Sequence, residues 1–162
     1  MRASVRSASG VRLARGQGVS AIGLVRTEFL LPDDAKIPDR VFYAAAFNAL
    51  LEAAQQLPVT LRLLDLAPDK HPVWASALPV SNPLGLHGSR LYRHPLVRTV
   101  VEAQLQALGD LCLPFSGSLL LPNVDTVEEF QQWRASIQAA MSNPEVSVGA
   151  MLETTGATLA VD

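Results

Sequence analysis

The chain has 162 residues, of which 13 are basic and 15 acidic, giving a formal net charge of −2. Hydrophobic residues make up 49% of the sequence, enough to bury the core of one domain. This balance excludes the basic surface typical of nucleic-acid-binding proteins, and no apolar run is long enough to cross a membrane. The single cysteine, Cys112, excludes an internal disulfide and favours a cytoplasmic location.

Short apolar runs alternate with segments of helical periodicity along the whole chain. The runs that predict buried strands are 3–5, 21–25, 59–64, 117–121 and 146–152. The segments that predict helices are 9–15, 40–56, 95–109 and 126–140, and a further helix is expected to begin after the last strand. Pro95 is placed to open the third helix, and Thr126-x-x-Glu129 is a capping box for the fourth.

Strict alternation of strands and helices predicts an α/β fold with a parallel sheet. The strands are continuously apolar, as expected where helices or a barrel interior cover both faces. Periodicity alone does not separate a doubly wound sheet from a barrel. Gly16-x-Gly18 precedes a strand instead of following one, so it does not match a dinucleotide-binding loop.

Charged residues follow the apolar strands directly. Strand 21–25 runs into Arg26 and Glu28, strand 59–64 contains Arg62 and runs into Asp65, and strand 146–152 is followed by Glu153. In a barrel these strand ends meet on one face, where two forked guanidinium groups suit a phosphate and a carboxylate. A carboxylate on a third strand suits Mg²⁺. The pattern leaves open a second interpretation, in which Arg26–Glu28 and Arg62–Asp65 are ordinary ion pairs.

Six segments carry a more specific pattern. They are 21–30 (AIGLVRTEFL), 59–65 (VTLRLLD), 68–70 (PDK), 82–90 (NPLGLHGSR), 121–129 (LPNVDTVEE) and 148–154 (VGAMLET). In this order they resemble the motifs of phosphoenolpyruvate (PEP)-utilising enzymes, a family that includes enzyme I of the bacterial sugar phosphotransferase system, PEP synthase and pyruvate phosphate dikinase. The Asp69-Lys70 pair favours a resemblance to enzyme I, which is a PEP-protein phosphotransferase.

The resemblance implies a fold and a domain organisation. It implies a (β/α)₈ TIM barrel, of which residues 1–162 would form one incomplete PEP-binding domain with about the first five strands. The remaining barrel strands and the family's swivelling phosphohistidine domain are not matched within these 162 residues. Open edges on the first and last strands predict association of the chain into a homo-oligomer.

The resemblance also implies roles for particular residues. Arg26 and Arg62 would bind PEP, and Glu153 would bind Mg²⁺. His87 would be a third substrate-binding residue, although it stands where the family has an arginine. Imidazole has a shorter reach than a guanidinium group and is only partly charged near neutral pH. The substitution therefore weakens the expected site.

The function implied is that of a transferase of the kinase type, which moves the phosphoryl group of PEP to a protein histidine and releases pyruvate. The histidine would lie on the swivelling domain or on a carrier protein, as in sugar transport. The chain alone is expected to be inactive, because the second metal ligand and the proton donor of the family are not matched. Three alternatives stay open: a non-catalytic interaction or regulatory domain, a PEP synthase- or dikinase-like enzyme, and a lyase on a related barrel.

Overall fold

The computed structural model describes residues 1–32, 34–66, 72–76, 78, 87–111, 117–141 and 146–161. Five strands form one sheet, and every neighbouring pair is parallel. The strands are β1 (Arg2–Val5), β2 (Ala21–Arg26), β3 (Val59–Arg62), β4 (Gly117–Leu121) and β5 (Ser147–Ala150). The five predicted strands are therefore confirmed, although β3 and β5 each end two residues earlier than the sequence suggested.

The order of strands across the sheet is β1-β2-β3-β4-β5. A doubly wound sheet reverses its strand order at a switch point, whereas a barrel adds each strand beside the previous one. The observed order thus settles the choice that periodicity left open. The fold is α/β with strands and helices alternating, as in part of a TIM barrel.

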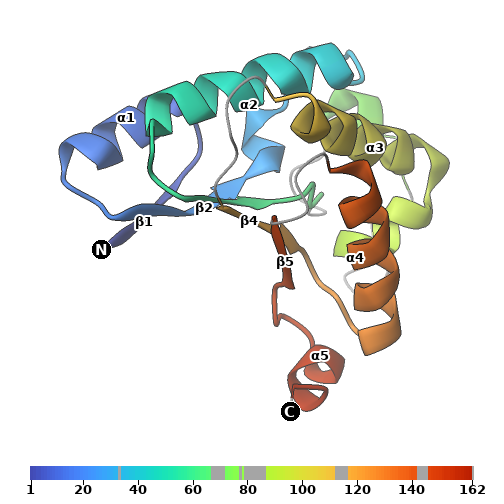
Figure 1. Ribbon diagram of the computed structural model, residues 1–162. Coiled ribbons are helices and arrows are strands. Elements are labelled where there is room, and N and C mark those ends of the chain that lie inside the picture. Colours follow the sequence, from blue (N-terminus) through green and yellow to red (C-terminus); the bar gives the residue numbers. More distant parts are fainter. Residues whose placement is uncertain are drawn as a thin grey trace.

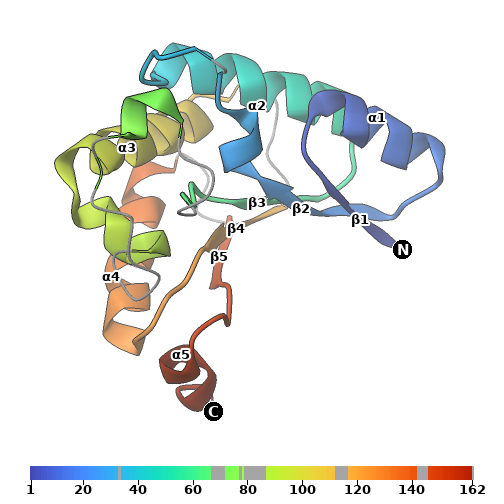
Figure 2. The same ribbon diagram turned by 180° about the vertical axis from the view of Figure 1, so that it is seen from behind.

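Helices connect the strands and lie along the sheet (Figure 1). They are α1 (Ala8–Gly16), α2 (Arg40–Ala54), α3 (Pro95–Gly109), α4 (Val127–Ala140) and the short α5 (Thr155–Leu159), with 3₁₀ turns η1 (Thr27–Leu30), η2 (Val73–Ala75) and η3 (Gly88–Arg93). Helix α1 contacts α2, α2 contacts α3, and α3 contacts α4. Helix α5 lies apart from the other helices, near the end of β5, in both views (Figures 1 and 2).

Local sequence fixes where these helices begin. The side chains of Ser7, Asp39, Thr126 and Thr154 each accept a hydrogen bond from a backbone N–H in the first turn of α1, α2, α4 and α5. Helix α3 has no such cap and begins with Pro95, whose lack of an N–H costs no intrahelical hydrogen bond at the first helical position. The predicted capping residue and the predicted proline start are both confirmed.

The hydrophobic core lies between the sheet and the helices. Strand residues such as Ile22, Val25 and Leu61 are buried, and the predicted apolar faces of α2 and α3 pack against them. Burying this apolar surface supplies the main stabilisation of the fold, at roughly 25 cal/mol per Å². The strands are thereby fixed in register, and their carboxyl ends come to one edge of the sheet.

No helix in the described part of the chain is long and apolar enough to cross a membrane. The Pro68-Asp69-Lys70 motif lies outside the described residues, as do residues 82–86 of the fourth motif. Strands β1 and β5 are the outer strands of the described sheet.

Candidate functional site

The two predicted ligand-binding arginines are the last residues of neighbouring strands. Arg26 ends β2 and Arg62 ends β3, and the parallel register pairs their Cα atoms directly. Glu153 follows β5 by three residues, and His87 precedes the η3 turn. The carboxyl ends of the strands therefore present Arg26, Arg62 and Glu153 from one edge of the sheet.

Arg62 is a buried guanidinium group surrounded by carboxylates. Its side chain is 8% exposed. Its Nη2 atom lies 2.5 Å from Glu28 Oε1 and 3.1 Å from Asp65 Oδ2, while Nη1 lies 3.8 Å from Glu153 Oε1. The three carboxylates come from the segments that follow β2, β3 and β5. The Arg62 guanidinium group thus links the segments that follow β2, β3 and β5.

Arg26 lies nearer the surface, with 31% of its side chain exposed. Its Nε atom is 3.9 Å from Glu28 Oε1, and its guanidinium group stacks 4.4 Å from the centre of the Phe29 ring. The ion pairs Arg26–Glu28 and Arg62–Asp65, the second interpretation of the sequence, are both present. They occur together with the convergence of Arg26, Arg62 and Glu153, so the two interpretations are not exclusive.

The loop after β4 holds Glu153 in place. The Oε2 atom of Glu153 accepts a hydrogen bond from the backbone N–H of Asn123 at 3.2 Å, and Asn123 has a left-handed backbone with φ of 47°. The Thr154 hydroxyl donates to the carbonyl of Val124 at 2.9 Å. These two contacts tie the end of β5 to the end of β4, leaving Glu153 Oε1 toward Arg62.

The same loop also fixes the segment that carries His87. The backbone N–H of Ser89 donates to the carbonyl of Pro122, and the Ser89 hydroxyl donates to the buried carboxylate of Glu129, both at 3.0 Å. Glu129 Oε2 also accepts from the N–H of Asp125. The start of α4 is therefore bonded to the turn that begins after His87.

Electrostatics place the site residues in one region. Burial raises the pKa of the Asp65 carboxyl above its ordinary value, Arg62 opposes that rise, and Glu28 and Glu153 add to it. His87 also lowers the pKa of Asp65, so it lies within electrostatic reach of the cluster. Arg26 and Arg62 end neighbouring strands, and Glu153 lies 3.8 Å from Arg62. The expectation that these residues and His87 bind a ligand stays a prediction.

Two buried atoms of the cluster have no hydrogen-bond partner among the described residues. They are Arg62 Nε, a donor, and Glu28 Oε2, an acceptor. Buried polar atoms are normally paired, because leaving one unpaired costs about 1–3 kcal/mol. The cluster therefore retains bonding capacity that its own side chains do not use.

The side chains of the site suit Mg²⁺ only if Glu153 is the single protein ligand of the ion. Glu153 has a carboxylate one-third exposed, with one oxygen fixed by Asn123. Mg²⁺ is commonly held by one or two carboxylates, with water and ligand phosphates completing the octahedron. Within the described ranges, no three His, Cys, Asp or Glu side chains gather as a metal-binding group.

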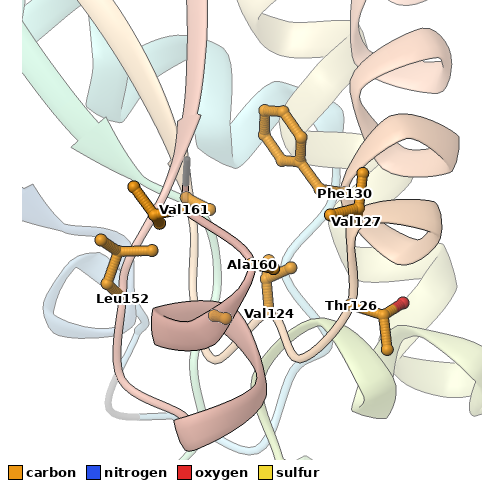
Figure 3. Close-up of a pocket in the computed structure, with 9 residues that line it drawn as sticks. Val124, Thr126, Val127, Phe130, Leu152, Ala160 and Val161 are labelled. Atoms are coloured by element: carbon orange, nitrogen blue, oxygen red, sulfur yellow. The ribbon is translucent and has the colours of Figure 1, made fainter.

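A separate pocket of about 270 Å³ lies between α4, α5 and the end of β5 (Figure 3). Its lining is almost entirely apolar and includes Val127, Phe130, Leu152 and Val161. None of the four predicted site residues lines it. It lacks the charged groups that phosphate or carboxylate recognition requires, so the charged cluster remains the better candidate for a ligand site.

The fold and the cluster define an α/β-barrel-type domain with cationic groups at the carboxyl ends of its strands. Residues 1–162, the whole chain, match the family described as PEP-utilising enzyme, PEP-binding domain. The chain belongs to this family, as its six motifs suggested.

The chain is distantly related to a multiphosphoryl transfer protein and to PEP-protein phosphotransferases. A multiphosphoryl transfer protein of Xanthomonas campestris is 31% identical over 166 residues, which cover 99% of this chain and 20% of that protein. A PEP-protein phosphotransferase of Enterococcus faecalis is 28% identical over 156 residues, covering 90% of this chain and 27% of that protein. The chain thus spans about a fifth to a quarter of these relatives.

Sequence reasoning missed three contacts of the site. The Glu28–Arg62 pair joins two strands, the Asn123 N–H binds Glu153, and Arg6 stacks on the same Phe29 ring as Arg26, at 4.5 Å. The parallel register of β2 and β3 could have indicated the first contact, because it brings Arg26 and Arg62 level. The backbone N–H of Asn123 has no signature in the sequence.

Proposed function

We propose that this chain binds PEP through Arg26 and Arg62, with His87 as a third contact, and that Glu153 holds Mg²⁺ beside the ligand. The observation that carries the proposal is the pairing of Arg26 with Arg62 across adjacent strand ends, with Glu153 3.8 Å from Arg62. Two guanidinium groups side by side match a small molecule that has both a phosphate and a carboxylate. The Nε–H of Arg62, which has no hydrogen-bond partner in the described part of the chain, supplies a donor for such an anion.

Charge balance explains why a metal ion is part of the proposal. Arg62 faces the carboxylates of Glu28, Asp65 and Glu153. These negative charges would repel a multiply charged anion that approached Arg62. Mg²⁺ bound at Glu153 would neutralise ligand charge and link it to the site. Arg62 would orient the anion, and the burial of its guanidinium would strengthen that interaction by lowering the local dielectric.

The activity proposed for the protein is transfer of the PEP phosphoryl group to a protein, as the name of the Enterococcus faecalis relative suggests. The motif resemblance implies that the acceptor is a histidine and that pyruvate is released. Such transfer depends mainly on positioning and on neutralising charge, which are the tasks assigned here to Arg26, Arg62 and Glu153. The accepting histidine would belong to a phosphohistidine domain or a carrier protein, in a cytoplasmic sugar phosphotransferase pathway. The 162 residues by themselves are expected to bind PEP without transferring its phosphoryl group.

Calorimetric titration with PEP and Mg²⁺ tests the binding proposal. We expect Arg62→Ala to weaken binding by about ten- to a hundred-fold, since a hydrogen bond to a charged group contributes about 1.5–3 kcal/mol. Arg98→Ala is the matched control, because Arg98 pairs with Glu102 on the exposed face of α3, away from the site. Equal affinities for the two variants, or no binding by the unaltered chain, would contradict the proposal.

A second candidate function is a non-catalytic interaction domain that keeps the fold. The observation that favours it is His87, which stands at a position where the resemblance expects an arginine. His87→Arg distinguishes the two functions. In a PEP-binding domain it should strengthen PEP binding several-fold in the same titration, whereas in a pure interaction domain no binding should appear.

We also propose that the chain associates with a second copy through the outer strands β1 and β5. Outer strands present unpaired backbone donors and acceptors, which a second sheet can satisfy. Size-exclusion chromatography with light scattering should give the mass of a dimer or larger assembly. A monomer that unfolds cooperatively would argue against association.

A further inference from the structure

Glu28 occupies a special place between the two arginines. Its Oε1 atom lies 2.5 Å from Arg62 Nη2 and 3.9 Å from Arg26 Nε, so a single oxygen contacts both guanidinium groups. The side chain is only 12% exposed. Among the described residues, no other carboxylate forms ion pairs with both Arg26 and Arg62, since Asp65 and Glu153 contact Arg62 alone.

The local backbone explains how Glu28 reaches its position. Strand β2 passes directly into the 3₁₀ turn η1, which starts at the fully buried Thr27. This tight turn brings Glu28 back over the neighbouring strand, where Arg62 ends β3. Because the turn is anchored by a buried residue, the carboxylate is held firmly with respect to both strands.

Two positive groups on adjacent strand ends repel each other. A carboxylate shared between them offsets that repulsion and restricts the orientations each can adopt. The short Glu28–Arg62 bond fixes one guanidinium, and the weaker Arg26 contact adds to the stacking of Arg26 on Phe29. The distance between the two donors thus depends on Glu28.

We propose that Glu28 is a positioning residue that sets the spacing of the Arg26 and Arg62 guanidinium groups. By doing so it makes the site select small molecules that carry two anionic groups, a phosphate and a carboxylate, over a lone phosphate. This inference rests on the proposed function, because it assumes that both arginines contact the ligand. Glu28 itself does not contact the ligand in this proposal.

If Glu28 competed with the ligand, neutralising it would change anion affinity in the opposite direction. If Glu28 were only a negative charge competing with the ligand for Arg62, its neutralisation would strengthen the binding of every anion. If it sets the spacing, neutralisation weakens binding of the two-headed ligand and changes binding of inorganic phosphate little, because a lone phosphate can use one arginine. The direction of change separates the two roles.

The first experiment needs no ligand. Nitrogen-15 NMR of the arginine side chains is recorded for the unaltered chain, Glu28→Gln and the control Asp65→Asn. We expect Glu28→Gln to shift the Nε–H signals of both Arg26 and Arg62, and Asp65→Asn to shift only that of Arg62. An unmoved Arg26 signal in Glu28→Gln would overturn the proposal.

The second experiment compares affinities for PEP and inorganic phosphate, each with Mg²⁺, by calorimetry. We expect Glu28→Gln to weaken PEP binding about ten-fold or more while phosphate affinity changes by less than about three-fold. Equal losses for both ligands, or tighter binding of either, would overturn the proposal. If the unaltered chain binds neither ligand, the proposed function fails, and the NMR result alone decides the role of Glu28. Glu28→Asp, with a shorter reach, serves the same tests if Glu28→Gln does not fold.

Discussion

Gly88 is the position where a single added methyl group should disturb both the fold and the site. It begins η3 with a left-handed backbone, φ 51°, which L-residues other than glycine adopt only with strain. A Cβ placed there would lie 2.4 Å from the Asn123 Cβ and 2.6 Å from the Pro122 carbonyl oxygen. Ordinary contacts between such atoms are about 3.5–4.0 Å.

The expected loss of stability for Gly88→Ala follows from these two effects. The left-handed backbone costs roughly 1–2 kcal/mol for alanine. Overpacking against atoms that cannot move away, here largely backbone, typically costs about 1–3 kcal/mol more. We therefore expect a loss of about 2–5 kcal/mol, a large fraction of the ~5–15 kcal/mol that stabilises a typical domain.

Urea denaturation followed by far-ultraviolet circular dichroism measures this loss, with Gly16→Ala as the matched control. Gly16 is the last residue of α1. Apart from its chain neighbours and the backbone of α1 itself, no atom of the described residues lies within 4 Å of a Cβ built there. Alanine favours a helix over glycine by up to ~1 kcal/mol, so the control should be neutral or slightly stabilising. Equal urea midpoints for the two variants would refute the reasoning.

Three further changes test individual contacts. Burial raises the pKa of Asp65, so its ionised form weakens the fold as pH rises through that pKa. Asp65→Asn should therefore raise the free energy of unfolding at pH 7, and the difference should vanish in acid, as urea titrations at several pH values can show. Tyr92→Phe removes the buried 2.7 Å hydrogen bond to the Leu64 carbonyl and should cost about 1–2 kcal/mol by thermal unfolding. Ser89→Ala deprives buried Glu129 of a donor and should cost about 1.5–3 kcal/mol by urea denaturation, whereas an unchanged midpoint would mean the bond contributes nothing.

The sequence was sufficient to predict the elements of the fold. Each of the five apolar runs became a strand, because buried parallel strands need little more than continuous apolar residues. The ends of the strands were harder to predict. Leu63 and Leu64 are fully buried yet lie beyond β3, because the chain stays in the core after the strand has ended. Apolar character alone therefore overestimates strand length.

The site was predictable in part. Placing Arg26, Arg62 and Glu153 at one edge required only that parallel strands end on the same side. Which carboxylate binds which arginine was not predictable, because that depends on the η1 turn and on sheet register. The ion pairs considered from the sequence were the local ones, Arg26 with Glu28 and Arg62 with Asp65. The shortest contact instead joins Arg62 to Glu28, which follows the neighbouring strand.

The proposed ligand role of Arg62 would account for the burial of its charge. A buried ion cluster seldom stabilises a fold more than apolar residues of similar volume would, yet removing one member leaves its partners uncompensated. We therefore expect Arg62→Met alone to lose about 3–5 kcal/mol of unfolding free energy, because Glu28 and Asp65 lose their shared cation. Adding Glu28→Gln and Asp65→Asn should restore most of that stability without restoring PEP binding.

The comparison is made by urea denaturation and calorimetric titration of the single and triple variants side by side. Recovery of stability without recovery of binding would show that the charges serve the ligand and not the fold. A triple variant that is less stable than Arg62→Met would mean that the remaining carboxylates were not the source of the loss. In that case the cluster would be a structural network, and the burial of Arg62 would no longer argue for a ligand site.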